Sequence, residues 1–305
     1  MSISTRSPAP ALFRAVVIGA ALLAAGCRPS APPAGAATTV EPAPKPAQAL
    51  RVLSAHLRGN DLAAYASDAI PPSLHARLDT AWREGRTRWP LDALPFGQRL
   101  PGLLKSLAAP DAEARLQRVF DRQFAHADRQ IHGAATSLGL FGAQYLEQEG
   151  DYSDDERQHY AQLVAAASRW GAQAPLGDPQ RARAAIVTLT ATARRTGLTS
   201  EAAFRAAGMD TSLARMGAFA AVFKQALRRY GLDLDAALDA MDISLLQQTG
   251  DDAKVRMRYS FGGQPIDTVV AMRRVGGRWY IADDLRHVEA ALLRPLPAPT
   301  PAAAP

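Results

Sequence analysis

The stretch Lys254-Val-Arg-Met-Arg-Tyr-Ser-Phe-Gly-Gly263 carries the clearest structural signal in the chain. Apolar side chains occupy every second position and polar side chains the positions between them, which is the pattern of a strand with one buried face. The Gly-Gly pair predicts a two-residue hairpin loop, and that loop fixes the pairing of the strands. The predicted register places Val255 opposite Val270, Met257 opposite Thr268, Tyr259 opposite Ile266 and Arg258 opposite Asp267.

A second hairpin is expected at Gly276-Gly277. It places Met272 opposite Ile281 and Arg274 opposite Trp279. A first strand, Ile243 to Gln248, joins through the turn at 249–252. Because both hairpins put their apolar residues on the same face, the sequence predicts a four-stranded antiparallel meander over residues 242–293, and helices must cover that face.

Residues 49–241 show the three-to-four-residue apolar spacing of helices and almost no strand signal. Ser153 to Glu156 forms a capping box at the start of one helix, and Asp178-Pro179 starts the next. The stripe from Asp111 onward predicts a helix that ends near Gly133, followed by a separate buried helix from Ala134 to Leu146. Without a regular repeat, this region is expected to be an irregular helical bundle, and the fold class is α+β, mainly α.

The amino-terminal segment 1–26 has the features of a secretory signal peptide. Arg6 and Arg14 lie in a short polar start, and the apolar run Ala15 to Ala25 is too short to span a bilayer, which needs about 20 apolar residues. Residues 27–48 are rich in proline and alanine and predict an extended tether, and the similar residues 294–305 predict a disordered tail.

The end of this segment, Leu23-Ala24-Ala25-Gly26-Cys27, resembles the lipobox of bacterial lipoproteins. The leucine usual three places before the cysteine is Ala24 here. The resemblance implies that Cys27, the single cysteine of the chain, is acylated and becomes the new amino terminus. It also implies sorting to the outer membrane with the body facing the periplasm, since Arg28 is not an aspartate; the inner membrane remains the alternative. An incidental cysteine after an ordinary signal peptide is the other interpretation.

The segment Val275 to Ile281 and the hairpin before it resemble the last part of nuclear transport factor two-like domains. The likeness covers residues 243–285 and rests on a short Gly-Arg-Trp motif. Such folds serve as enzymes, ligand binders and scaffolds, so the resemblance implies no particular activity.

The sequence offers no motif for a catalytic, cofactor or metal site, and none is predicted. The histidines lack metal-binding spacing, and the lipobox resemblance implies that Cys27 is acylated and is therefore not a free nucleophile. One stretch, Trp82 to Trp89, interleaves aromatic and basic residues and is a candidate interaction site through Trp82, Arg86, Arg88 and Trp89. The favoured interpretation is that both tryptophans belong to the core and that the arginines cap a helix end.

The net charge of +6 is spread along the chain, and a nucleic-acid partner is not expected. The sequence therefore predicts a membrane-anchored periplasmic lipoprotein, whose body is a non-enzymatic module that binds an envelope protein or a small ligand. The alternative is a hydrolase-like envelope enzyme with a pocket between helices and sheet.

Overall fold

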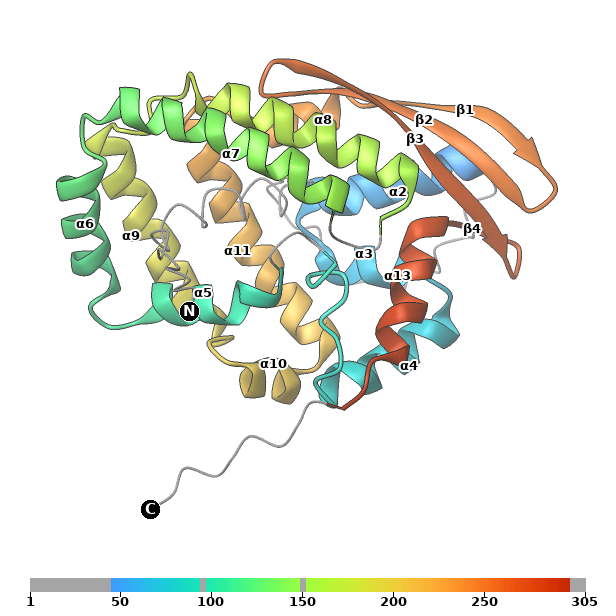
Figure 1. The fold of residues 1–305 in the computed structure, drawn as a ribbon. Helices are drawn as coiled ribbons and strands as arrows, with labels where there is room; N and C mark the ends of the chain where they lie inside the picture. Colours follow the sequence, from blue (N-terminus) through green and yellow to red (C-terminus); the bar gives the residue numbers. More distant parts are fainter. Residues whose placement is uncertain (1–44, 94–96, 149–151, 297–305) are drawn as a thin grey trace, which may run out of the picture.

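The computed structural model describes residues 45–93, 97–148 and 152–296. Within these ranges the chain forms α-helices over most of its length and then a four-stranded antiparallel sheet, so the predicted mainly-α α+β class is confirmed (Figure 1). The helices that precede the sheet are α2 (Pro46–Gly59), α3 (Leu62–Asp68), α4 (Pro72–Arg83), a 3-10 turn (Gly97–Arg99), α5 (Leu100–Ala108), α6 (Ala112–Gln123), α7 (Asp128–Gln148), α8 (Asp154–Gly171), α9 (Pro179–Thr196), α10 (Glu201–Ala207), α11 (Met209–Arg229) and α12 (Leu234–Asp239).

The sheet has the order β1-β2-β3-β4 and follows the predicted register pair by pair. Its strands are β1 (Asp242–Thr249), β2 (Asp252–Phe261), β3 (Gln264–Val275) and β4 (Arg278–Ile281). Both glycines of each hairpin loop have positive φ, from 56° to 84°. A side chain is strained in that conformation, which explains why glycine pairs determine these turns.

The apolar face of the sheet is covered from two directions. Leu50 of α2 packs with Val255, Met272 and Trp279 in one cluster. The tip of the β2–β3 hairpin packs through Phe261 on Trp170 of α8 and its neighbours. In Figure 1 the sheet arches over α2, while α7 and α8 run together along the upper side of the body. The largest core cluster lies below, among α3, α4, α5, α9, α10 and α11.

Residues 282–293 form a helix, α13 (Ala282–Leu293), which the sequence did not predict. The meander therefore ends at Ile281. Leu285, Val288 and Ala291 of α13 are buried in the main core. Their three-residue spacing is a helical signal. This apolar pattern follows directly after a strand, however, and it covers only about one and a half helical turns. This helix brings the end of the described chain back against α4 (Figure 1).

Two further expectations about the helices are wrong. The helix α7 continues through Gly133, because one glycine costs a helix only about 1 kcal/mol. The stretch Ala134 to Leu146 is also not buried, since Leu140 and Phe141 are exposed. In addition, α2 begins at Pro46 and so includes the last three residues, 46–48, of the predicted tether.

Candidate functional site

A group of interacting polar and ionisable side chains lies where α3, α8, β2 and α13 meet. We call it the α8–α13 cluster. Its members are Tyr65 of α3, Tyr259 of β2, Ser153, Glu156, His159 and Tyr160 at or near the start of α8, and Asp283, Asp284, Arg286 and His287 of α13.

Glu156 is the centre of this cluster. Its carboxylate accepts a hydrogen bond from the backbone N–H of Ser153 at 3.1 Å, which completes the capping box of α8. The same carboxylate contacts Arg286, and its Oε1 lies 3.4 Å from Nε2 of His287. The hydroxyl of Ser153 donates to Asp283 at 2.9 Å. The capping residues of α8 therefore also attach α13, which lies 130 residues further along the chain.

The charges of this group stabilise one another. Burial raises the pKa of Glu156, but the hydrogen bonds that its carboxylate accepts and the positive charges of His287 and Arg286 together outweigh burial and leave that pKa below its ordinary value. Burial likewise lowers the pKa of His287, and the hydrogen bond and charge of Glu156 reverse that effect and raise it. An imidazolium beside a carboxylate is the arrangement that both shifts favour.

Asp284 has a different environment. Its Oδ2 accepts a hydrogen bond from the hydroxyl of Tyr65 at 3.1 Å. Burial raises the pKa of Asp284 to about 7, and the negative charges of Glu156 and Asp283 act in the same direction. Burial also raises the pKa of Tyr65. Near neutral pH, Asp284 therefore exchanges a proton where an exposed aspartate would be fully ionised.

The third part of the cluster joins α8 to the sheet. Nε2 of His159 lies 2.7 Å from the hydroxyl of Tyr259, and the imidazole stacks on the ring of Tyr160 at 6.0 Å. Burial lowers the pKa of His159 to about 4, and it raises that of Tyr259. His159 is therefore neutral at pH 7, and its imidazole and the hydroxyl of Tyr259 form a hydrogen bond between two uncharged groups.

The cluster has the residue types for proton transfer, but most of its polar atoms are already engaged with one another. The described residues contain no group of three or more His, Cys, Asp or Glu side chains arranged to hold a metal ion. The geometry therefore fits best a set of contacts that fastens α13 and the sheet to α8, with Asp284 as its titratable member.

A second feature is the outer face of α7. Leu140 is 73% exposed, Phe141 is 67% exposed and Tyr145 is 44% exposed. These residues recur at helical spacing on one side of the helix. From Gln130 to Leu146 the sequence of α7 contains no Asp, Glu, Lys or Arg. An exposed helical surface with large apolar side chains and no charge is unusual for a monomeric soluble body.

Small residues hold the opposite side of α7 against α8. A Cβ atom built on Gly139 would lie 2.4 Å from Oγ of Ser168, and one built on Gly142 would lie 2.9 Å from a methyl of Val164. The Ser168 hydroxyl donates to the carbonyl of Ala135 at 3.1 Å. The two helices therefore approach closely, and the large side chains of α7 remain on the outer face.

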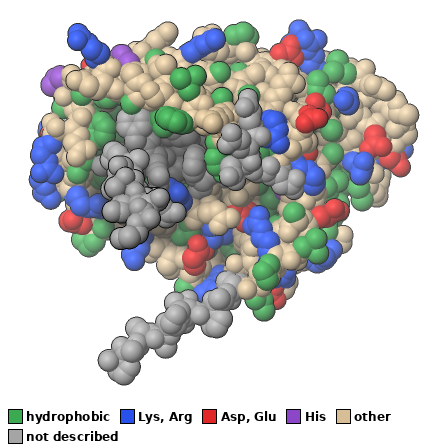
Figure 2. Space-filling model, viewed as in Figure 1, with side chains coloured by type: hydrophobic (Ala, Val, Ile, Leu, Met, Phe, Trp, Pro, Cys, Tyr) green, Lys and Arg blue, Asp and Glu red, His purple; other side chains and the backbone are tan. Residues whose placement is uncertain are grey.

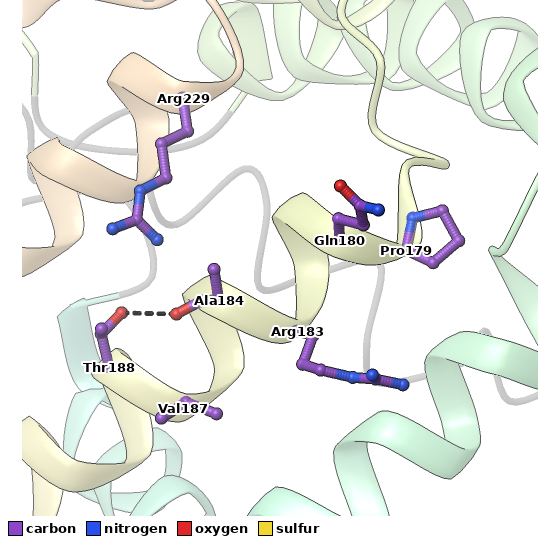
Figure 3. Close-up of a pocket in the computed structure, with 7 residues that line it drawn as sticks. All are labelled: Pro179, Gln180, Arg183, Ala184, Val187, Thr188 and Arg229. Atoms are coloured by element: carbon purple, nitrogen blue, oxygen red, sulfur yellow. Dashed lines mark hydrogen bonds between the residues drawn. The ribbon is translucent and has the colours of Figure 1, made fainter.

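A shallow depression of about 470 Å³ lies between α9 and α11. It is lined by Pro179, Gln180, Arg183, Ala184, Val187, Thr188 and Arg229. Figure 3 shows Arg229 extending from α11 toward α9, whereas Arg183 lies on the other side of α9 and extends away from Arg229. The two guanidinium groups do not converge on one point, so the depression lacks the geometry to grip a single anion.

The predicted interaction stretch is largely internal. Trp82 and Trp89 are each only 1% exposed, as the core interpretation expects. Arg86 donates to the carbonyl of Leu292 at 2.7 Å and pairs with Glu84. Arg88 pairs with Glu201 and lies over the ring of Phe204. None of these side chains presents a free aromatic surface to a ligand.

Sequence reasoning missed both features that the structure brings forward. It identified Glu156 only as a capping residue, because the link to His287 depends on the tertiary fold. It treated the apolar residues of α7 as core. The absence of charge over 130–146 was the available signal, but a buried helix and an exposed apolar helix share it.

Cys27 and the lipobox-like stretch lie outside the described residues. Among the helices of the described ranges, none is long and apolar enough to cross a membrane. Comparison of the chain with known protein families, curated proteins and solved structures finds no match.

Proposed function

We propose that this chain is a lipid-anchored protein of the cell envelope, facing the periplasm, and that its folded body is a non-enzymatic interaction module. The stretch Leu23 to Cys27 supports the anchor, through its resemblance to a lipobox. Acyl chains on Cys27 would each contribute about 0.8 kcal/mol of membrane affinity per buried methylene. An apolar surface on the body supports the interaction role.

The observation that best supports an interaction module is the exposed apolar outer face of α7. Two neighbouring large side chains, Leu140 and Phe141, are 73% and 67% exposed. The helix that carries them has no Asp, Glu, Lys or Arg from Gln130 to Leu146. Burial of each such side chain would contribute about 1.5–3 kcal/mol of favourable free energy, which is absent while it is exposed. Contact with another envelope component would recover this energy, so α7 is the proposed contact surface.

The alternative is a hydrolase-like envelope enzyme that uses the α8–α13 cluster. The specific observation in its favour is Asp284, whose pKa of about 7 suits a group that exchanges protons at neutral pH. Against it stands the engagement of Glu156 and His287 with each other, which leaves no nucleophile with an adjacent free base in the cluster. An ester- or amide-hydrolysing activity that Asp284→Asn abolishes in a folded protein would favour the enzyme.

The anchor is tested by metabolic labelling with a radioactive fatty acid. We expect label on the wild-type protein and its recovery with membranes. A Cys27→Ala variant should carry no label, since no other cysteine is present in the chain. A wild-type protein that is unlabelled and recovered in the soluble fraction would contradict the anchor.

A further inference from the structure

A group of exposed basic side chains lies on α6 and at the start of α7. Arg129 is exposed at the start of α7, and because Leu140 follows eleven residues later, close to three full turns, both lie on the same side of the helix. Arg118 and Arg122 are exposed one turn apart on α6, just before the corner at His126. Figure 2 shows basic side chains over α6 at the left-hand edge of the view.

These three arginines form no ion pair or hydrogen bond within the part of the chain that the structure describes. The nearest acidic residues in sequence are engaged elsewhere. Asp121 accepts a hydrogen bond from Gln117 at 2.8 Å, and Asp128 accepts one from the backbone N–H of Gly177 at 3.0 Å. Both carboxylates keep their negative charge, so residues 118–129, with three Arg, two Asp and His126 counted as neutral, carry a net charge of about +1, and the three guanidinium groups remain accessible to an anionic partner.

The tether sets no preference for one face of the body over another. The 17 residues from 28 to 44 separate Cys27 from the first described residue. Fully extended, they reach about 60 Å. A body of this size has a radius of gyration of about 18 Å, so such a tether permits any face to meet the membrane. The chemistry of the surface then decides which face does so.

We propose that the outer face of α7, together with Arg118, Arg122 and Arg129, lies on the surface of an anionic phospholipid bilayer. This inference rests on the proposed function, because it names the partner of the α7 contact surface. Leu140 and Phe141 enter the boundary between headgroups and acyl chains, and Tyr145 lies at headgroup level, where its ring and hydroxyl are both accommodated. The arginines attract the phosphate groups.

An anchored body needs little intrinsic affinity for this contact. A tether of this length gives an effective concentration in the millimolar range at the membrane surface. A contact made by two inserted side chains and three cations is therefore more populated in the anchored body than in the same body free in solution.

The test uses the chain from residue 28 onward, which contains every described element and all three apolar clusters but lacks the acylated cysteine. Partition is measured by sedimentation with vesicles of phosphatidylcholine alone, or with phosphatidylglycerol added. We expect stronger partition to the anionic vesicles, which weakens as salt is raised. Leu140→Ser/Phe141→Ser should reduce partition about tenfold or more.

Matched controls distinguish binding through this face from nonspecific adsorption of the protein to vesicles. Leu245→Ser/Leu246→Ser removes two apolar side chains of β1 that are 47% and 51% exposed and should leave partition unchanged. Arg118→Gln/Arg122→Gln/Arg129→Gln should remove the preference for anionic vesicles, whereas Arg183→Gln/Arg229→Gln should not. Equal partition of the α7 variant and wild type, or no preference for anionic vesicles, would overturn the inference. Since this form lacks Cys27, its result is independent of the labelling test for the anchor.

Discussion

Asp284 is the residue whose chemistry departs most from its ordinary behaviour. Its folded pKa of about 7 exceeds the unfolded value near 3.8, so the folded state binds the proton more tightly. Stability contributed by this residue is therefore lost as pH rises from about 4 to about 7. Asp284→Asn keeps a neutral group beside Tyr65 at every pH. We expect the variant to be more stable than wild type at pH 8 by about 2–4 kcal/mol and nearly equal to it at pH 4.

This prediction is checked by urea unfolding of both proteins across the pH range. The difference between them isolates Asp284 from Glu156 and His287, which titrate in both. Asp267→Asn is a suitable control, because that carboxylate lies on the exposed sheet face and pairs with Arg256. A stability difference for Asp284→Asn that does not change with pH would contradict the assigned environment.

At the residue scale, the sequence predicts local roles better than distant ones. The capping role of Glu156 follows from its position three residues after Ser153. Its contacts with Arg286 and His287 could not be predicted, because nothing local records that α13 returns to the start of α8. Trp82 and Trp89 show the same limit, since the sequence leaves both a surface and a core interpretation open and burial decides between them.

At the scale of elements, the close contact of α7 with α8 depends on glycine. Gly139 and Gly133 are both inside α7, but a Cβ on Gly139 meets Ser168, whereas one on Gly133 meets nothing within 4 Å. Replacing either by alanine gains about 1 kcal/mol of helix propensity. We expect Gly133→Ala to be neutral or stabilising and Gly139→Ala to be destabilising by about 1–3 kcal/mol, since the contact must open.

Thermal and urea unfolding of this pair of variants measures the difference directly. Hydrogen exchange of the α7 amides locates it, and we expect faster exchange in α7 of Gly139→Ala while the sheet is unaffected. If both variants are equally stable, α7 is not held against α8 in the way that the structure describes.

Elements were predictable where a turn fixes geometry. The two Gly-Gly loops determine the register of β2, β3 and β4, and every predicted pair is found. The helix α13 was missed because its short apolar pattern directly follows a strand. The helix α7 was predicted to be buried because an apolar sequence without charges does not reveal whether its large side chains face the core or the solvent. Packing partners, which decide both cases, lie far along the chain.

At the scale of the whole molecule, the outer surface of the sheet and the outer face of α7 have opposite character. The exposed sheet face carries paired charges, such as Arg256 with Asp267 and Arg258 with Asp242. Pairs of this kind are solvated and contribute little to stability. The face of α7 lacks paired charge and carries exposed apolar side chains, so we expect the body, if it is tethered through Cys27 as proposed, to orient α7 toward its partner.

The most direct test of this account is photocrosslinking in intact envelopes. A benzophenone side chain replaces Phe141 in the full-length protein, and in a second variant it replaces Leu246 of β1, which is 51% exposed. Irradiation should give a phospholipid adduct from position 141 and little from position 246. No adduct at 141, or equal adducts at both positions, would contradict the claim that α7 is the contact surface, and a protein adduct at 141 would contradict the bilayer as its partner.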